Sequence, residues 1–160
     1  MSKQDRYGGT SALQFEGTGF FRLEETERRW WLVDPDGYAF FSLAINHVDE
    51  TNLKYPHNFH VYTDRYGNRE DWIRSGVVTD LQSWGFNTIG WTQEYVTEQL
   101  RHSTGWSEAD YNLADMPFVI LLPIAEFESW NTHPFFPGVF SDEFDAWCEY
   151  SARRICTTYA

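Results

Sequence analysis

Two glutamates near the end of a predicted strand could act as a carboxylate pair. Glu126 and Glu128 follow the apolar run 116–125, and they are the carboxylate pair at the end of a predicted strand. Residues i and i+2 of an extended segment point the same way, and hydrolysis of a glycosidic bond needs two carboxylates roughly 5 to 9 Å apart. Glu126 is therefore the best catalytic candidate in the chain. From the residues alone we favour a plainer interpretation, in which one or both are solvated loop acids or orient other groups.

Polar and aromatic side chains also follow the other predicted parallel strands. Asn46 and His47 come directly after one apolar run, Trp91 and Thr92 after the next, and Trp130 lies in the loop after the third. Amide and imidazole groups can hydrogen-bond sugar hydroxyls, and an indole can stack on a pyranose face. We favour this role because, when parallel strands form an α/β barrel, the residues that follow their carboxyl ends line the active site. The alternative for Asn46 and His47 is a loop start satisfied by local hydrogen bonds.

The histidines allow a metal site to be considered. His57 and His60 are three residues apart, and His47 and Asp49 are close in sequence. Their segment has the composition of a loop, which fixes no acidic partner, so we predict no metal. Dinucleotide-binding glycine motifs, a P-loop and a nucleophile elbow are all missing from the sequence. No cofactor is therefore expected.

The elements that must position these residues come in a clear order. Strands 20–25 and 29–33, joined by a turn, continue through the turn Asp34-Pro-Asp-Gly37 into a further strand, as an antiparallel meander. Strands and helices then alternate, which predicts a parallel sheet. The expected ranges are strand 38–45, loop 49–68, helix 69–84, strand 86–91, helix 93–101, strand 116–125, loop 126–140 and a helix from 141.

This order predicts an α/β fold. The expected units are a flexible arm at 1–14, a β-meander at 15–37, and an incomplete (β/α)8 (TIM) barrel of about three βα units at 38–160. An eight-unit barrel takes about 250 residues, so we expect the chain to be part of a longer protein or to self-associate. Three parallel strands would otherwise leave a hydrophobic edge open to water.

Charge limits the partners that suit this chain. The net charge is −12, and no run of Lys or Arg interrupts the acidic character. Such a field repels phosphate backbones and anionic lipid surfaces, so we expect neither nucleic acid nor membrane as a partner. A neutral oligo- or polysaccharide is compatible with it. The N-terminal residues have no apolar signal region, which is typical of a cytoplasmic chain or of a secreted one whose leader is absent.

Aromatic residues make up 19% of the chain, including eight Trp. An aromatic-rich core would account for part of this excess, because large rings favour burial. The other part is explained by stacking platforms for flat ligands, of which sugars are the usual example. The composition leaves both interpretations open.

Four segments resemble the opening of agarase-like (β/α)8-barrel glycoside hydrolases. They are Phe-Phe-Arg-Leu-Glu-Glu at 20–25, Trp-Trp-Leu-Val-Asp-Pro-Asp-Gly at 30–37, Phe-Phe-Ser-Leu-Ala-Ile-Asn-His at 40–47 and Gly-Phe-Asn-Thr-Ile-Gly at 85–90. The resemblance extends over roughly 18–160. It implies that the chain is the N-terminal half of such a barrel.

The resemblance also implies roles for individual residues. His47 and His57 would belong to the sugar site, together with Asn46 and Trp91. The family's acid/base follows the fourth barrel strand and its nucleophile the seventh, neither of which this sequence contains. Glu126 would then bind or orient substrate, with Trp130 beside it in the same loop.

Two functions follow from these observations. The first is a retaining β-glycosidase acting on a galactan-type polysaccharide such as agarose, of which this half would be inactive alone. The second is a non-catalytic carbohydrate-binding protein that uses the same aromatic and polar residues.

Overall fold

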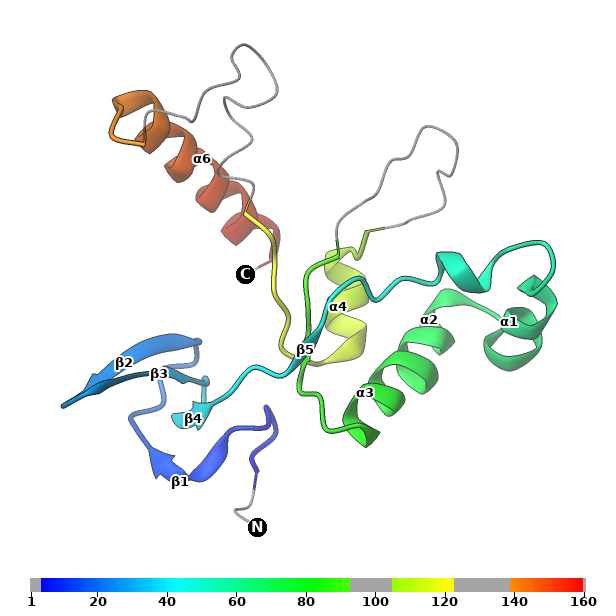
Figure 1. Ribbon diagram of the computed structural model, residues 1–160, viewed down its shortest axis with the longest axis horizontal. Helices are drawn as coiled ribbons and strands as arrows, with labels where there is room; N and C mark the ends of the chain where they lie inside the picture. Colours follow the sequence, from blue (N-terminus) through cyan, green and yellow to red (C-terminus); the bar gives the residue numbers. More distant parts are fainter. Residues whose placement is uncertain (1–3, 93–104, 123–138, 160) are drawn as a thin grey trace.

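The computed structural model describes residues 4–92, 105–122 and 139–159. Four strands at its N-terminal end form an antiparallel sheet in the order β1-β4-β3-β2. Figure 1 shows this sheet in blue, on the opposite side of the molecule from the helices α1–α3. The strands are β1 (Thr10–Gln14), β2 (Arg22–Thr26), β3 (Arg29–Val33) and β4 (Tyr38–Phe40).

The turn between β3 and β4 is the one predicted from the sequence. Asp34 accepts hydrogen bonds at Oδ1 from the backbone N–H groups of Asp36 (3.0 Å) and Tyr38 (2.9 Å). Gly37 has φ 94°, and a side chain there would meet the carbonyl oxygen of Phe15 at 2.5 Å. Both the torsion and the space therefore require glycine at this position.

Strand β1 lies in the segment that the sequence predicted to be a flexible arm. It pairs antiparallel with β4, with Thr10 opposite Ala39. The hydrophobic pattern of Thr10–Gln14 is too weak to predict a strand from sequence. The segment becomes a strand because its backbone pairs with the edge of β4. Residues 10–14 are therefore part of the sheet.

A second, parallel set of strands follows. β5 (Ala44–Ile45) pairs with β6 (Thr88–Ile89), and Ile89 forms a parallel bridge to Phe118. The predicted single strand 38–45 is thus divided: its first residues belong to the antiparallel sheet and its last to the parallel one. One apolar run can contribute to two sheets, because an apolar sequence indicates that a segment is buried but does not indicate which strand it pairs with.

Helices make up most of the remaining described chain, with α1–α3 on one side of the parallel strands and α6 apart from them (Figure 1). They are η1 (Thr51–Leu53), α1 (Phe59–Tyr66), α2 (Arg69–Asp71), the π-helical turn η2 (Trp72–Val78), α3 (Thr79–Ser83), α4 (Glu108–Ala114) and α6 (Asp142–Tyr159). The helix predicted at 69–84 is confirmed as the run α2–η2–α3, and the helix predicted from 141 is confirmed as α6. α1 lies in the loop predicted at 49–68, and α4 lies between the predicted helix 93–101 and strand 116–125, where the sequence predicted no helix. The helix predicted at 93–101 lies outside the described residues.

The hydrophobic core sits between these helices and β6. Ile73 and Ile89 have no exposed surface, and Trp72, Trp106 and Tyr111 pack around them at about one-twentieth exposure or less. No helix in the described ranges is both long and apolar enough to cross a membrane. The described residues form an antiparallel sheet, a short parallel set and helices, and they do not close a barrel. The expected incomplete barrel is therefore observed only as a mixed α/β arrangement.

Candidate functional site

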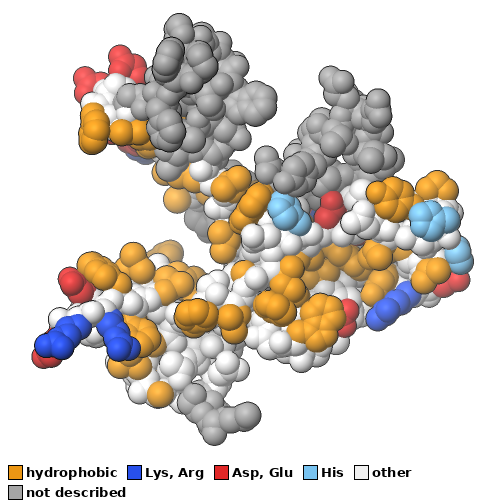
Figure 2. Space-filling view, viewed as in Figure 1, with side chains coloured by type: hydrophobic (Ala, Val, Ile, Leu, Met, Phe, Trp, Pro, Cys, Tyr) orange, Lys and Arg blue, Asp and Glu red, His pale blue; other side chains and the backbone are white. Residues whose placement is uncertain are grey.

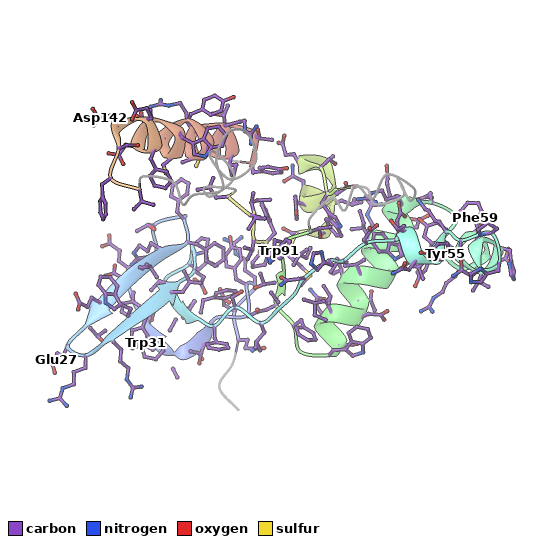
Figure 3. All side chains as sticks on the ribbon, turned by 45° about the horizontal axis from the view of Figure 1, so that its top comes forward. Glu27, Trp31, Tyr55, Phe59, Trp91 and Asp142 are labelled. Carbon is purple, nitrogen blue, oxygen red and sulfur yellow. The ribbon has the colours of Figure 1, made fainter. Side chains whose placement is uncertain are left out.

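Three of the predicted site residues, Asn46, His47 and Trp91, lie together at the carboxyl ends of β5 and β6. The ladder between these strands continues past their ends, because the N–H of Gly90 donates to the carbonyl of Ile45 (2.9 Å) and the N–H of His47 donates to the carbonyl of Trp91 (3.0 Å). Asn46 and His47 thereby lie next to Trp91, which Figure 3 labels near the centre of the molecule. Residues far apart in sequence are brought together as the strand order required.

His47 and Trp91 also touch through their rings. The ring centroids are 4.5 Å apart and the planes are inclined by 69°, an edge-to-face contact. His47 has φ 57°, which is uncommon for a residue other than glycine and costs of order 1 kcal/mol. The side chain of His47 is exposed and that of Trp91 is half-buried, so both present surface to solvent. Strain at an exposed residue of a strand end is typical of a functional position.

Glycine at position 90 allows Asn46 to lie flat against the strand. A Cβ atom on Gly90 would stand 2.2 Å from Oδ1 of Asn46 and 2.6 Å from the carbonyl oxygen of Ile45. No larger residue fits without moving one of them. Sequence reasoning gave Gly90 no role, although a glycine inside a strand pattern is a known signal of close backbone approach.

Thr92 adds a polar group beside Trp91. Within the described part of the chain its Oγ1 is buried and has no hydrogen-bond partner. Buried hydroxyls are nearly always paired. A hydroxyl or a water held at the strand end could pair with it.

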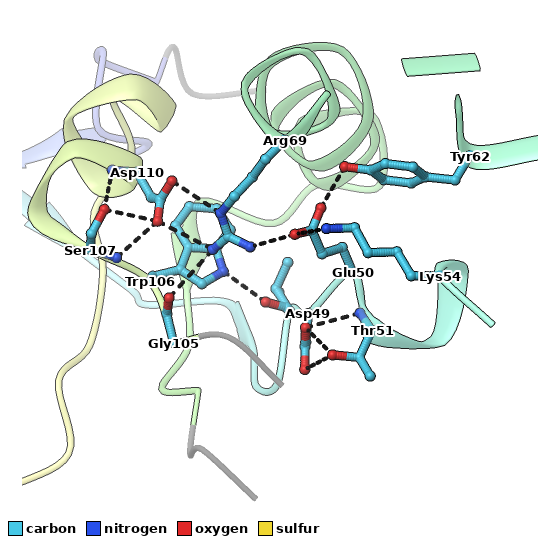
Figure 4. A network of polar contacts seen from close by, with 11 residues as sticks. Asp49, Glu50, Thr51, Lys54, Tyr62, Arg69, Gly105, Trp106, Ser107 and Asp110 are labelled. Atoms are coloured by element: carbon cyan, nitrogen blue, oxygen red, sulfur yellow. Dashed lines mark hydrogen bonds and ion pairs between the residues drawn. The ribbon is translucent and has the colours of Figure 1, made fainter. Parts of the chain in front are cut away.

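A buried ion network supports the loop that follows His47. The carboxylate of Glu50 has 4% of its surface exposed and accepts hydrogen bonds from Lys54, from the hydroxyl of Tyr62 and from Nη1 of Arg69, the last at 2.9 Å. Arg69 also contacts both carboxylate oxygens of Asp110 at 3.2 Å. Figure 4 shows Arg69 bridging the two acids. The network thus ties the loop to the starts of α2 and α4.

These contacts set the charge state of the network. Burial by itself raises the pKa of Glu50, but the hydrogen bonds from Lys54, Tyr62 and Arg69 outweigh it, so the pKa lies below the ordinary value. The pKa of Asp110 is also lowered, because its bonds to Arg69 and Ser107 exceed the opposing effect of burial. Burial and the bond to Glu50 raise the pKa of Tyr62. At neutral pH both acids are ionised and fully occupied, so neither is available as a catalytic acid or base.

Two further contacts hold the same loop. Nε1 of Trp106 donates to the carbonyl of Val48 at 2.8 Å, and Oδ1 of Asp49 accepts from the N–H of Thr51 at 3.0 Å. Sequence reasoning missed Trp106, Glu50 and Arg69. Only the start of α4 carried a readable signal, a capping box.

Of the other predicted residues, the structure describes His57, which lies in a different place. His57 stacks on Tyr55 with centroids 5.7 Å apart, and Figure 3 shows Tyr55 beside α1, away from Trp91. Glu126 and Trp130 lie outside the described residues. No group of three or more His, Cys, Asp or Glu in the described ranges could hold a metal ion.

Comparison with known proteins finds partial matches to agarases. Over 87 residues the chain is 33% identical to β-agarase B of Vibrio sp. (strain JT0107), a match that covers 52% of this chain and 9% of that protein. No family model matches the chain. Three solved structures share the fold of nearly the whole chain. They are BpGH50 (TM-score 0.62, 22% identity, 91% of this chain), an exo-β-agarase (0.58, 16%, 98%) and the agarase AgWH50C (0.56, 15%, 99%).

This chain resembles part of a GH50 agarase. It spans 32%, 32% and 30% of the three solved chains and a smaller share of the Vibrio protein. The resemblance predicted from the sequence is confirmed at this level. It relates the chain to glycoside hydrolases, while the roles of its individual residues stay predictions.

Proposed function

We propose that Asn46, His47 and Trp91 form part of a saccharide site in an agarase-like glycoside hydrolase that acts on a galactan-type polysaccharide. The observation that carries the proposal is the contact of His47 with Trp91 across the ends of two adjacent parallel strands. The partial match to agarases supports the same substrate class. A net charge of −12 is compatible with a neutral polymer.

Each side chain offers one kind of contact to a sugar. The amide of Asn46 and the ring of His47 are exposed and can hydrogen-bond hydroxyl groups. Trp91 offers apolar ring surface for the C–H face of a pyranose. The buried hydroxyl of Thr92 provides a further bond at the base of the site.

The parallel strands β5, β6 and the bridge at Phe118 are proposed as the first three strands of a (β/α)8 barrel. Their order and direction support this, as does the fold shared with agarase chains about three times as long. In a retaining glycosidase one carboxylic acid protonates the leaving oxygen and a second carboxylate attacks the anomeric carbon. The described residues would bind the sugar, with that carboxylate pair supplied from elsewhere in the barrel, so the chain by itself binds without cleaving.

Titration with neutral agaro-oligosaccharides tests the proposed site. Trp91→Ala should weaken binding about tenfold or more, equivalent to about 1.4 kcal/mol. Trp84→Ala is the matched control, because Trp84 is 65% exposed and precedes β6, at the opposite end of this strand from Trp91. Equal affinities of the two variants, measured by calorimetry or by chemical-shift titration, would remove Trp91 from the site.

A non-catalytic carbohydrate-binding protein is the second candidate. It is favoured by the acids next to the described strand ends: Asp49 is bonded to Thr51, and Glu50 is held in the ion network. Release of reducing ends from agarose separates the two functions. If the complete polypeptide hydrolyses agarose, and Trp91→Ala weakens both binding and hydrolysis, the hydrolase is supported. If the complete polypeptide binds agarose and releases no reducing ends, the second candidate is supported.

A further inference from the structure

We propose that the buried network of Glu50, Arg69 and Asp110 is a positioning device, which keeps His47 in its strained conformation against Trp91. The inference rests on the proposed saccharide site and adds three residues that act on it through the backbone. Their effect is transmitted through Val48 and Asp49, the two residues that separate His47 from Glu50.

The segment that carries His47 is held on both sides. On the strand side, the carbonyl of Ile45 and the N–H of His47 are bonded to the backbone of Gly90 and Trp91. On the other side, the carbonyl of Val48 accepts from Trp106. The positive φ of His47 lies between these two attachments, so the backbone there cannot relax unless one of them is released.

Glu50 is a second attachment on the loop side. Its buried carboxylate is bonded to three elements: Lys54 at the end of η1, Tyr62 on α1 and Arg69 on α2. Arg69 continues to Asp110, which also caps the start of α4 through Ser107. The position of the loop is thereby set against two helices that pack on the core, which is how a rigid scaffold orients a binding residue.

The chemistry of the network fits a geometric role. Arg69 is a planar donor that contacts two carboxylates at once, which fixes their separation as a flexible lysine would not. Its guanidinium also lies 5.8 Å from the ring centre of Trp72 and 6.0 Å from that of Trp106. Trp106 in turn donates a hydrogen bond to the carbonyl of Val48. Arg69 therefore restrains the loop through Glu50 and through Trp106.

Three variants of the full chain test the inference. Arg69→Lys keeps the positive charge but loses the planar guanidinium that bonds two carboxylates. Glu50→Gln keeps the shape of the side chain but loses its charge. Tyr62→Phe removes one hydroxyl and leaves the ion pairs in place. Arg153→Gln is the matched control, because Arg153 forms an exposed pair with Glu149 on α6. The first readout is the nuclear Overhauser contact between the rings of His47 and Trp91 in the free protein.

The expected result is loss of the ring contact in Arg69→Lys and Glu50→Gln, a partial loss in Tyr62→Phe, and no change in Arg153→Gln. Agaro-oligosaccharide affinity should fall about fivefold with the contact, as expected when preorganisation is lost. Tyr62→Phe decides the matter if the other two variants fail to fold. The inference would be overturned if a folded Tyr62→Phe or Arg69→Lys protein kept the ring contact and if the chemical shifts of residues 46–50 did not change.

The two proposals fail in different ways. If the unmodified chain shows no affinity for the oligosaccharides, the proposed function falls, and the ring contact in the free protein still decides whether the network positions His47. If affinity is present and stays unchanged in variants that have lost the ring contact, the positioning role falls and the saccharide site stands.

Discussion

The antiparallel sheet and the helical part around β5 and β6 are stabilised in different ways. The antiparallel sheet is built mainly from neighbours in sequence, joined by hairpins and by the turn at Asp34-Pro-Asp-Gly37. The parallel part depends on distant pairs, such as Ser42 with Thr88 and Trp106 with Val48, which are 46 and 58 residues apart. The candidate site lies in the part that only long-range contacts can assemble.

Burial separates the two regions as well. Among the described residues, ten buried hydrophobic side chains of the helical part form one cluster, whereas the antiparallel sheet buries only Val33, Ala39 and Phe40 and leaves Trp30 65% exposed. Figure 2 shows hydrophobic side chains spread over the outer surface of the sheet region. Most of the stabilisation from apolar burial therefore comes from the helical part.

The largest expected effect comes from the core of the helical part. Ile73→Ala should lower the free energy of unfolding by about 2–5 kcal/mol, because it leaves a cavity among fully buried side chains. Leu23→Ala in the antiparallel sheet is the counterpart, and its effect should stay within about 0.5 kcal/mol. Urea unfolding measures both. Equal losses would mean that the two regions share stability evenly.

Gly90→Ala should have the next largest effect, about 1–3 kcal/mol, because the added Cβ collides with Asn46 and Ile45. Gly19→Ala in the antiparallel sheet region meets no atom within 4 Å and carries only the strain of φ 81°, about 1 kcal/mol. Thermal unfolding compares the two variants, and shifts in the Asn46 amide signals should occur only in the first. A smaller loss for Gly90→Ala than for Gly19→Ala would contradict the close approach.

The smallest expected effect is an opposite response of the two regions to acid. The pKa values of Glu50 and Asp110 are lowered, so their contribution is complete above their unfolded values, about 4, and is lost as pH falls through the folded values. Burial and the charge of Asp5 raise the pKa of Asp34, so the antiparallel sheet gains stability as pH falls toward the unfolded value, about 3.9.

Amide hydrogen exchange between pH 6 and pH 3 resolves this response by region, once rates are corrected for intrinsic pH dependence. Protection should fall at the start of α2 and α4 and hold or rise around Asp34. Arg153→Gln serves as a control, because its exposed pair on α6 should alter neither trend. Parallel loss of protection in both regions would show that the network does not govern the acid response.

The sequence predicted what local chemistry encodes. The turn at Gly37, the helix over 69–84 and the meeting of Asn46 and His47 with Trp91 all follow from spacing, turn residues and strand order. The network was not predictable, because Arg69 is 19 residues from Glu50 and 41 from Asp110, and nothing in their local sequence marks them as partners.

Two errors had local causes. The helix α1 contains His, Val, Tyr, Thr and Asp, all of modest helix propensity, so its composition resembled a loop. The helix α4 begins with the pattern Ser107-x-x-Asp110, and a capping box of this kind would have located it. The division of strand 38–45 could not be read from its apolar run, since both halves are apolar.

The three residues between β4 and β5 have a consequence for how this protein can change over evolutionary time. Asn87 holds both ends of this connector, through the carbonyl of Phe41 at 3.0 Å and the N–H of Leu43 at 2.8 Å. Inserting or deleting one residue there would reverse the inward and outward faces of one sheet relative to the other. Relatives should therefore vary in the length of the loops beyond the strand ends and keep this connector at a constant number of residues.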